Sequence, residues 1–264
     1  MQVSRRGWLK NAGVACFGAA SGGLAASLCG ASTPSGAGAP PLPWPYVKLD
    51  PDAVAATAYE MHYKGGCCYA VSGSIIGELA KKVGAPFTTW PTAVMTYGGA
   101  GVAGVGSLCG ALNGAAMVTF LLAGSSEKEK QSKASEITRD IFNWYAQTAL
   151  PTFRPAQPKF ETVKVICRSN LCHISVTKWC KASKCKFTSK EREERCACLS
   201  GSVAKRTVEL LNAHLAGEFK AAYKLPAETQ KCRDCHDKGS AREDSRAQMD
   251  CGVCHFTKTP HPQL

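Results

Sequence analysis

The order of hydrophobic and polar positions along the chain predicts helices throughout its first half. Asp50-Pro51 has the signature of a helix start, and the spacing after it predicts a helix to about Lys64. A glycine pair, Gly65-Gly66, ends this helix, and Cys67 to Val83 predicts a second one. Two consecutive helices are therefore expected after residue 50.

The stretch between Lys82 and Glu127 carries no charged residue, which raises the question of a membrane span around 107–124. Glycines interrupt this stretch repeatedly, and no basic flank follows it. Close packing of helices in a protein core explains glycine and alanine at this spacing better than contact with lipid does. We therefore expect no membrane span in the mature chain.

Further helices follow, separated by a proline-rich connector. Ser125-Ser126-Glu127 predicts the cap of an amphipathic helix to about Ala149, whose apolar face is formed by Ile137, Ile141, Trp144 and Tyr145. Three prolines in 150–163 indicate a connector. Residues 167–198 show little periodicity, although a helix is expected to begin at Ser189 and run through Leu211.

The chain from Pro226 onward is polar and irregular, with too few apolar residues to fold by itself. Something other than a hydrophobic core must therefore order it. No run with the period of a strand occurs in the sequence. The expected fold class is mainly α, with a helical core domain followed by an irregular, cofactor-organised C-terminal segment rich in Cys and His.

The first residues have the features of an export signal. Ser4-Arg5-Arg6 contains a twin-arginine pair, an uncharged stretch rich in Ala and Gly follows, and Ala37-Gly38-Ala39 offers a cleavage site. A membrane anchor is the competing interpretation, but the stretch is rich in glycine and weakly hydrophobic. We therefore expect twin-arginine export to the periplasm, with Cys16 and Cys29 leaving in the cleaved signal.

Composition excludes some classes of protein and indicates metal or redox chemistry. The 264 residues are 45% hydrophobic and 20% charged, which is typical of a folded chain rather than a disordered one. The net charge of +12 suits an acidic partner, but no basic and aromatic pattern of a nucleic-acid binder occurs, so no nucleic acid is expected. The odd number of cysteines, 15, argues against a simple disulfide scaffold.

Two pentapeptides near the C-terminus have the Cys-x-x-Cys-His pattern that attaches c-type haem. They are formed by Cys232, Cys235 and His236, and by Cys251, Cys254 and His255. Two thiols at this spacing can bond both haem vinyl groups, and the next residue, histidine, then reaches the iron. The four cysteines also fit a zinc ribbon, and disulfides are a third interpretation, but a ribbon has no use for either histidine. Two covalently bound haems are therefore the favoured prediction.

Each haem iron also needs a ligand on its second face. The histidines outside the motifs are the candidates, in the order His173 and His261, then His214, then His62. Two histidine ligands give a lower reduction potential than histidine with methionine, and Met249 is the one methionine near the motifs. Bis-histidine ligation is therefore expected.

A second group of cysteines lies among lysines and arginines, whose charge favours the thiolates that bind metal. It contains Cys167, Cys172, Cys180, Cys185, Cys196 and Cys198. We expect an iron–sulfur cluster of the 2Fe–2S type, although the spacing differs from that of regular ferredoxins. Structural disulfides are the alternative, because the compartment is oxidising. Cys67, Cys68 and Cys109 are interpreted as small buried hydrophobes.

The sequences Gly66-Cys67-Cys68-Tyr69-Ala70-Val71 and Cys109-Gly110-Ala111-Leu112-Asn113-Gly114 resemble the redox-active family named for a Cys … Cys-Gly-Ala-x-x-Gly … Cys … Cys pattern. Cys167 and Cys196 fall where its later cysteines would lie. With the two haem motifs and the leader, residues 50–264 resemble the split-Soret cytochromes c. The resemblance implies a homodimer with two haems per subunit at one end and an iron–sulfur cluster. It also implies two histidine ligands for each haem iron, supplied either by one subunit or by both. Its expected ligands are Cys172, Cys180 and Cys196, with Cys167 and Cys185 as further candidates.

These observations divide the chain into five parts: a twin-arginine signal at 1–39, a Pro-rich lead-in at 40–49, a helical CGAxxG-type domain at 50–163, a Cys-rich iron–sulfur segment and helix at 164–225, and a dihaem tail at 226–264. The expected function is that of a periplasmic cytochrome that carries electrons and docks an unidentified redox partner through its basic 178–206 region. A redox enzyme acting on a small substrate and a zinc-bearing interaction protein are the alternatives.

Overall fold

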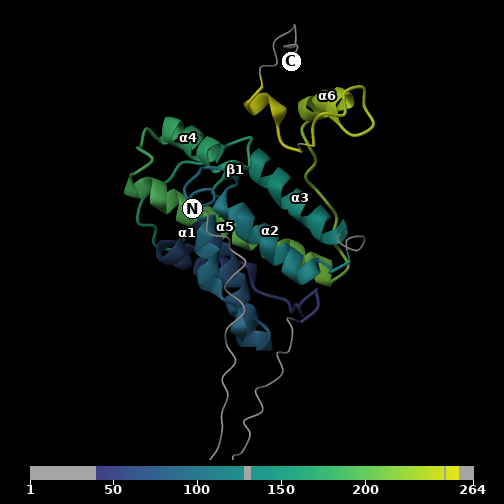
Figure 1. The fold of residues 1–264 in the computed structure, drawn as a ribbon. Coiled ribbons are helices and arrows are strands. Elements are labelled where there is room, and N and C mark those ends of the chain that lie inside the picture. Colours follow the sequence, from purple (N-terminus) through teal and green to yellow (C-terminus); the bar gives the residue numbers. More distant parts are fainter. Residues whose placement is uncertain (1–39, 128–131, 247, 256–264) are drawn as a thin grey trace, which may run out of the picture. The chain divides into compact units, whose positions relative to one another are not determined.

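The computed structural model describes residues 40–127, 132–246 and 248–255. The predicted twin-arginine leader with Cys16 and Cys29, and the candidate ligand His261, lie outside these residues. The described part is mainly helical, with two strands of two residues each (Figure 1). The predicted fold class is confirmed.

Helix α1 (Pro51–Val83) contains both helices predicted for this region. The Asp50 side chain accepts hydrogen bonds from the backbone N–H groups of Asp52 and Ala53, at 2.9 and 3.3 Å, and so caps the helix. Gly66 interrupts the helix with φ 79° and ψ −176°, a conformation that glycine adopts without steric penalty. The expected break at the glycine pair is therefore a kink between two helical halves.

Two short 3-10 helices, η1 (Phe87–Thr89) and η2 (Thr92–Gly98), lead to α2 (Gly110–Ala123) and α3 (Ser132–Gln147). In α3 the predicted apolar face is buried, with Ile137, Ile141 and Tyr145 at 0% exposure. The predicted start of this helix falls partly at residues 128–131, which lie outside the described residues. In the part of the chain that the structure describes, no helix is long and apolar enough to cross a membrane.

The antiparallel strands β1 (Ala149–Leu150) and β2 (Val165–Ile166) pair across the ends of the predicted connector. They are followed by α4 (Cys172–Ser183) and α5 (Lys190–Leu215). The hydroxyl of Ser189 accepts the N–H of Arg192 at 3.3 Å, so α5 begins where the sequence predicts. Helix α4 was not expected, because its buried positions are only Ser175 and Trp179 and leave no apolar periodicity to detect.

The core is formed where α5 packs along α1 and α2 packs against both of these helices (Figure 1). Two glycines permit this close approach. A Cβ on Gly114 would lie 2.7 Å from the carbonyl oxygen of Cys68, and one on Gly201 would lie 3.0 Å from that of Ala55. The small residues of the uncharged stretch therefore serve packing between helices, as the sequence predicts.

The C-terminal segment contains α6 (Ala227–His236) and a 3-10 turn, η4 (Cys251–Val253). The helix corrects the expectation that this part of the segment is irregular. The chain leading to it is fixed by the buried side chain of Asp140 in α3. One oxygen of Asp140 accepts Nη2 of Arg206 at 2.7 Å, and the other accepts the N–H groups of Ala222 and Tyr223 at 2.6 and 2.9 Å.

Candidate functional site

A cavity of about 1070 Å³ lies between α1, α4, α5 and the glycine-rich loop 98–106. Five cysteine side chains from widely separated parts of the sequence line it: Cys67, Cys172, Cys180, Cys185 and Cys196. Every cysteine that the structure describes is a free thiol. The cavity, called the cysteine cavity below, therefore brings several soft sulfur donors to one site.

The loop that borders the cysteine cavity has an unusual backbone. Residues 100–104 all have positive φ, including Val102 at 64° and Ala103 at 49°. This conformation costs about 1–3 kcal/mol per non-glycine residue and is concentrated at functional sites. The loop holds the start of α4, because the carbonyl oxygens of Ser107 and Gly106 accept the N–H groups of Cys172 and His173 at 2.7 and 3.1 Å.

The Cys196 sulfur has the most polar surroundings among the cavity cysteines. The Cys67 thiol donates a hydrogen bond to it, and the guanidinium groups of Arg195 and Arg192 approach it at 3.8 and 4.0 Å. This hydrogen bond and the nearby positive charges hold the pKa of Cys196 well below its usual value, despite burial. Cys196 is therefore the more acidic thiol of the pair, and the pKa of Cys67, which donates that hydrogen bond, lies well above the usual value.

Arg195 is a buried cation, only 2% exposed, and so needs compensation. Its Nη2 donates to the Ser175 hydroxyl at 2.7 Å, and that hydroxyl is 2.9 Å from the Tyr145 hydroxyl. Among the described residues, no carboxylate forms a salt bridge with Arg195. The Cys196 sulfur, 3.8 Å from its Nη1, is the neighbour that best accommodates the positive charge. Arg195 therefore places a fixed positive charge beside the cavity wall at Cys196.

The remaining cavity thiols hold their protons more tightly. Burial raises the pKa of Cys172 to about 12 and also raises that of Cys180. No three His, Cys, Asp or Glu side chains in the described ranges already stand together as a metal-binding group. A metal centre in the cysteine cavity would therefore have to displace thiol protons and draw the sulfur atoms together.

The cavity gathers most of the cluster ligands predicted from the sequence, namely Cys172, Cys180, Cys185 and Cys196. Cys167 lies elsewhere: it is 1% exposed and donates to the carbonyl oxygen of Ser169 at 3.1 Å. Sequence reasoning treated Cys67 as a packing residue and did not single out Arg195. The glycine pair directly before Cys67 was the available signal, because a helix break there turns the chain beside the cavity.

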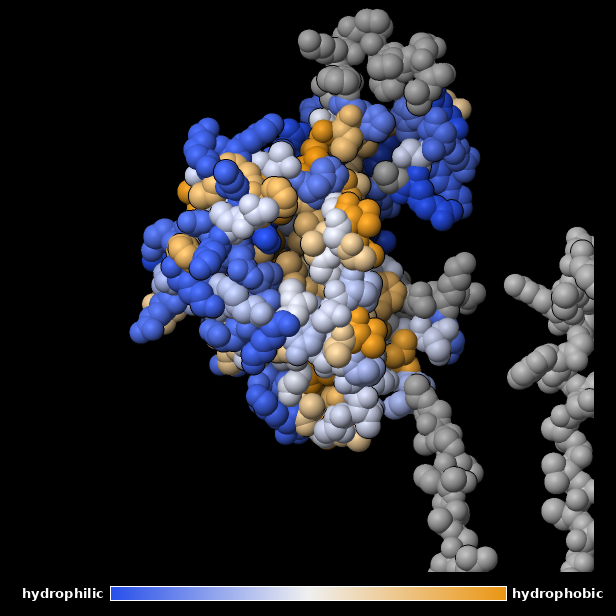
Figure 2. All heavy atoms as spheres, turned by 60° about the vertical axis from the view of Figure 1, so that its left-hand side comes forward, coloured by the Kyte–Doolittle hydropathy of each residue, from blue (hydrophilic) through white to orange (hydrophobic). Residues whose placement is uncertain are grey.

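Basic side chains surround the cavity opening. Lys64, Lys181, Lys186 and Arg192 are among its lining residues. Hydrophilic residues cover much of the face turned forward in Figure 2, with hydrophobic ones between them. The exposed Phe187 and Val105, at 69% and 78%, belong to the segments beside this opening. The rim thus combines positive charge with isolated apolar side chains.

The two Cys-x-x-Cys-His motifs meet in the tail. Helix α6, which carries Cys232, packs against η4, which carries Cys251, so the first cysteines of the two motifs are neighbours, while Cys235 and Cys254 are exposed. Burial, followed by the neighbouring Cys232, raises the pKa of Cys251. The structure therefore brings the predicted pair of haem motifs together at one end of the chain.

The tail is tied to the core by an ion pair. Nε of Arg168, just after β2, donates to Oδ2 of Asp250 at 2.7 Å, and the Asp250 side chain is only 4% exposed. The other oxygen of Asp250 accepts the N–H of Gly252 at 3.0 Å and caps η4. A small cavity of about 320 Å³ lies beside this contact, between α3 and the tail.

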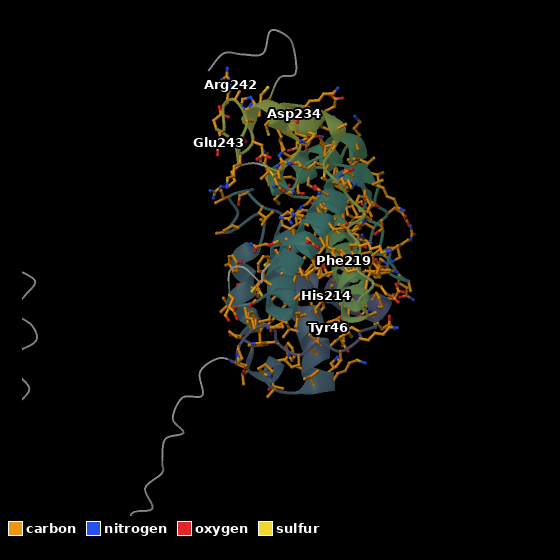
Figure 3. All side chains as sticks on the ribbon, turned by 90° about the vertical axis from the view of Figure 1, so that its right-hand side faces the viewer. Tyr46, His214, Phe219, Asp234, Arg242 and Glu243 are labelled. Carbon is orange, nitrogen blue, oxygen red and sulfur yellow. The ribbon has the colours of Figure 1, made fainter. Side chains whose placement is uncertain are left out.

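Three of the candidate distal histidines, His62, His173 and His214, lie in the described residues. His173 lies in the wall of the cysteine cavity, where its Nδ1 donates to the carbonyl oxygen of Gly106 at 3.0 Å, and His62 lines the same cavity. His214 is in the last turn of α5, and Figure 3 shows it at the level of Tyr46, away from Asp234 of the tail. Among the described residues, no hydrogen bond joins these histidines to either motif.

Comparisons with known proteins agree with these features. The sequence model of the family described as "Putative redox-active protein (C_GCAxxG_C_C)" matches residues 67–210. The order Cys109-Gly110 in this chain reverses the Gly-Cys of the printed pattern. The chain is also 35% identical over 221 residues to "Split-Soret cytochrome c" of Desulfovibrio desulfuricans, covering 80% of this chain and 77% of that protein.

The fold is similar to a solved structure described as "A novel iron centre in the split-Soret cytochrome c from Desulfovibrio desulfuricans ATCC 27774". The TM-score is 0.74 at 35% identity, and the match covers 83% of this chain and 95% of the other. The resemblance expected from the sequence is thereby confirmed. The chain belongs to the C_GCAxxG_C_C family and, within it, to the split-Soret cytochromes c, which are electron-transfer proteins.

Proposed function

We propose that this protein is a dihaem c-type cytochrome with an iron–sulfur cluster, which carries electrons between redox partners in the periplasm after twin-arginine export. The observation that carries this proposal is the packing of α6 against η4, which brings the two Cys-x-x-Cys-His motifs together. A redox protein with two attachment motifs at one end has a place for two closely spaced cofactors.

The tail residues fit haem attachment. The four motif cysteines are free thiols, and two of them, Cys235 and Cys254, are exposed to an incoming porphyrin. Thr229 is the only fully buried residue of α6 in the structure, so the tail lacks a core that an apolar macrocycle would supply. Each haem would provide one-electron iron chemistry, with His236 and His255 as its proximal ligands.

The cysteine cavity fits an anionic metal–sulfur centre. It offers five sulfur atoms, and Arg195 and Arg192 lie beside one of them, that of Cys196, whose pKa is lowered. We assign the cluster to this cavity, with Cys172, Cys180 and Cys196 as ligands and with Cys67 and Cys185 available for the remaining position. Cys167, directed at the backbone, is not part of this ligand set.

The distal haem ligands are proposed to come from a second subunit. His173 and His214 have no hydrogen bond to either motif of their own chain in the described residues, and His261 remains a candidate by sequence. In a homodimer, a histidine on one core can face the tail of its partner. His173→Ala and His214→Ala variants test this, because loss of a distal ligand converts one haem from low to high spin in the absorption and EPR spectra.

The native protein purified after export tests the cofactors themselves. We expect a pyridine haemochrome yield of two haems per chain, a mass gain of about 0.6 kDa for each, and a cluster EPR signal on reduction. Zinc with no mass gain would establish the ribbon interpretation instead. Haem without a cluster signal would remove only the assignment of the cysteine cavity, and the Cys196→Ser variant supplies the matched control.

A redox enzyme is the second candidate, favoured by the size of the cysteine cavity. Its volume of about 1070 Å³ is at the upper end of the range for small-molecule sites. Carbon monoxide and cyanide distinguish the two functions. A carrier keeps its haem spectra unchanged, because both axial positions are filled, whereas an enzyme with an open iron position changes its spectrum on binding.

A further inference from the structure

The two haem motifs differ in what their histidine rings contact. Nδ1 of His236 lies 2.6 Å from Oδ1 of Asp244, which is a short hydrogen bond to a carboxylate. The first motif thus has an acidic partner on the ring nitrogen opposite the one that would face iron.

This contact is built into the fold of the tail. The segment after α6 turns back on the end of the helix, where the carbonyl oxygens of Cys235 and His236 accept the N–H groups of Arg242 and Ser245 at 3.0 and 2.9 Å. These backbone hydrogen bonds bracket Asp244 in the sequence. They hold its carboxylate against the His236 ring, so the pair does not depend on the side chains alone.

In the part of the chain that the structure describes, the second motif shows no equivalent contact. Among the described residues, no hydrogen bond to the His255 ring is present, and its side chain is exposed. The nearest acid, Asp250, is instead engaged by Arg168 and by the backbone of Gly252. The two motifs therefore present different surroundings to the two haems that the proposed function places there.

A carboxylate on Nδ1–H has a defined effect on a metal-bound imidazole. It fixes the tautomer so that Nε2 is the ligand atom, orients the ring and makes Nε2 a stronger donor. Stronger donation stabilises ferric over ferrous iron and so lowers the reduction potential. We propose that Asp244 is a positioning residue that lowers the potential of the haem at His236, making the two haems of one chain inequivalent. This inference rests on the proposed function.

Potentiometric titration of the exported full-length protein, followed by absorption, tests the inference. In Asp244→Asn we expect the lower of the two haem potentials to rise and the other to stay unchanged. Glu243→Gln is the matched control, because it removes an adjacent exposed carboxylate (Figure 3) that has no hydrogen bond to His236. Its effect on either potential should be smaller than the shift that Asp244→Asn causes. Unchanged potentials in Asp244→Asn, or equal shifts of both haems, would overturn the inference.

Haem content separates this outcome from failure of the proposed function. A wild-type chain without haem refutes the proposed function, whereas two haems with no shift in Asp244→Asn refute the role of Asp244 alone. If Asp244→Asn loses the haem of the first motif, Asp244→Glu, which keeps a carboxylate, should restore that haem and a low potential. Failure of Asp244→Glu to do so would also count against the inference.

Discussion

The ion pair between Arg168 and Asp250 makes a quantitative prediction about how the tail is held. Replacing Arg168 by Met removes the guanidinium but keeps much of its aliphatic stem. The Asp250 side chain is 4% exposed and would be left with the N–H of Gly252 as its donor. Removal of a partner from a charged hydrogen bond costs about 1.5–3 kcal/mol.

The Arg168 side chain is itself 54% exposed, so water will partly replace the guanidinium and the lower part of that range applies. A loss of about 2 kcal/mol corresponds to about a 30-fold larger population of tail-open molecules. Amide hydrogen exchange followed by mass spectrometry measures this directly. Peptides from 227–255 should exchange about 30-fold faster in Arg168→Met, while peptides from α1 and α5 keep their protection.

The matched control is Arg154→Met. Its partner is Glu161, and the two side chains are 63% and 74% exposed, so this surface pair should contribute little. We expect less than about a threefold change in exchange for this variant. If the tail peptides of Arg168→Met exchange at the wild-type rate, the ion pair does not hold the tail, and the reasoning fails.

Three further predictions concern the core and the cysteine cavity. Asp140→Asn should lower the free energy of unfolding, measured in urea, by about 2–4 kcal/mol, because it weakens a buried ion pair. The control, Asp52→Asn, removes an exposed carboxylate and should change that free energy by less than about 1 kcal/mol. Equal effects of the two substitutions would contradict this account. Gly114→Ala should destabilise the protein by about 1–3 kcal/mol through overpacking. Gly77 has open space around it, so Gly77→Ala should stabilise its helix. A Gly114→Ala variant as stable as the wild type would refute the packing argument. In metal-free protein, Cys196 should be alkylated at pH values where ordinary thiols are protonated, and its reactivity should fall only as the pH drops through its lowered pKa; mass spectrometry showing the usual thiol pH profile would contradict this.

Much of the helical scaffold could be predicted because its signals are local. The Asp50-Pro51 pair, the glycine pair at 65–66 and the Ser189 cap each act within a few residues, and the structure shows all three in the expected roles. Helix α4 escaped prediction because only Ser175 and Trp179 are buried in it, so its stability comes from tertiary contacts.

The candidate site likewise has a part that local sequence signals predict and a part that depends on tertiary packing. Spacing alone predicts the two haem-attachment motifs, since two thiols and a histidine must be close in sequence to serve one porphyrin. The cysteine cavity depends on residues far apart in sequence, and the contact of Cys67 with Cys196 follows only from the packing of α1 on α5. The buried Arg195 is likewise indistinguishable in sequence from the half-buried Arg192 near the same helix start.

The way the tail is joined to the core has a consequence for assembly order. The core contains the cysteine cavity and is complete without the tail, which is fastened to it through the Arg168–Asp250 contact. In the proposed function, a cluster could thus be inserted into the core before translocation. Cys235 and Cys254 are exposed, so they stay accessible for haem attachment afterwards. Two maturation steps in two compartments then need no refolding between them.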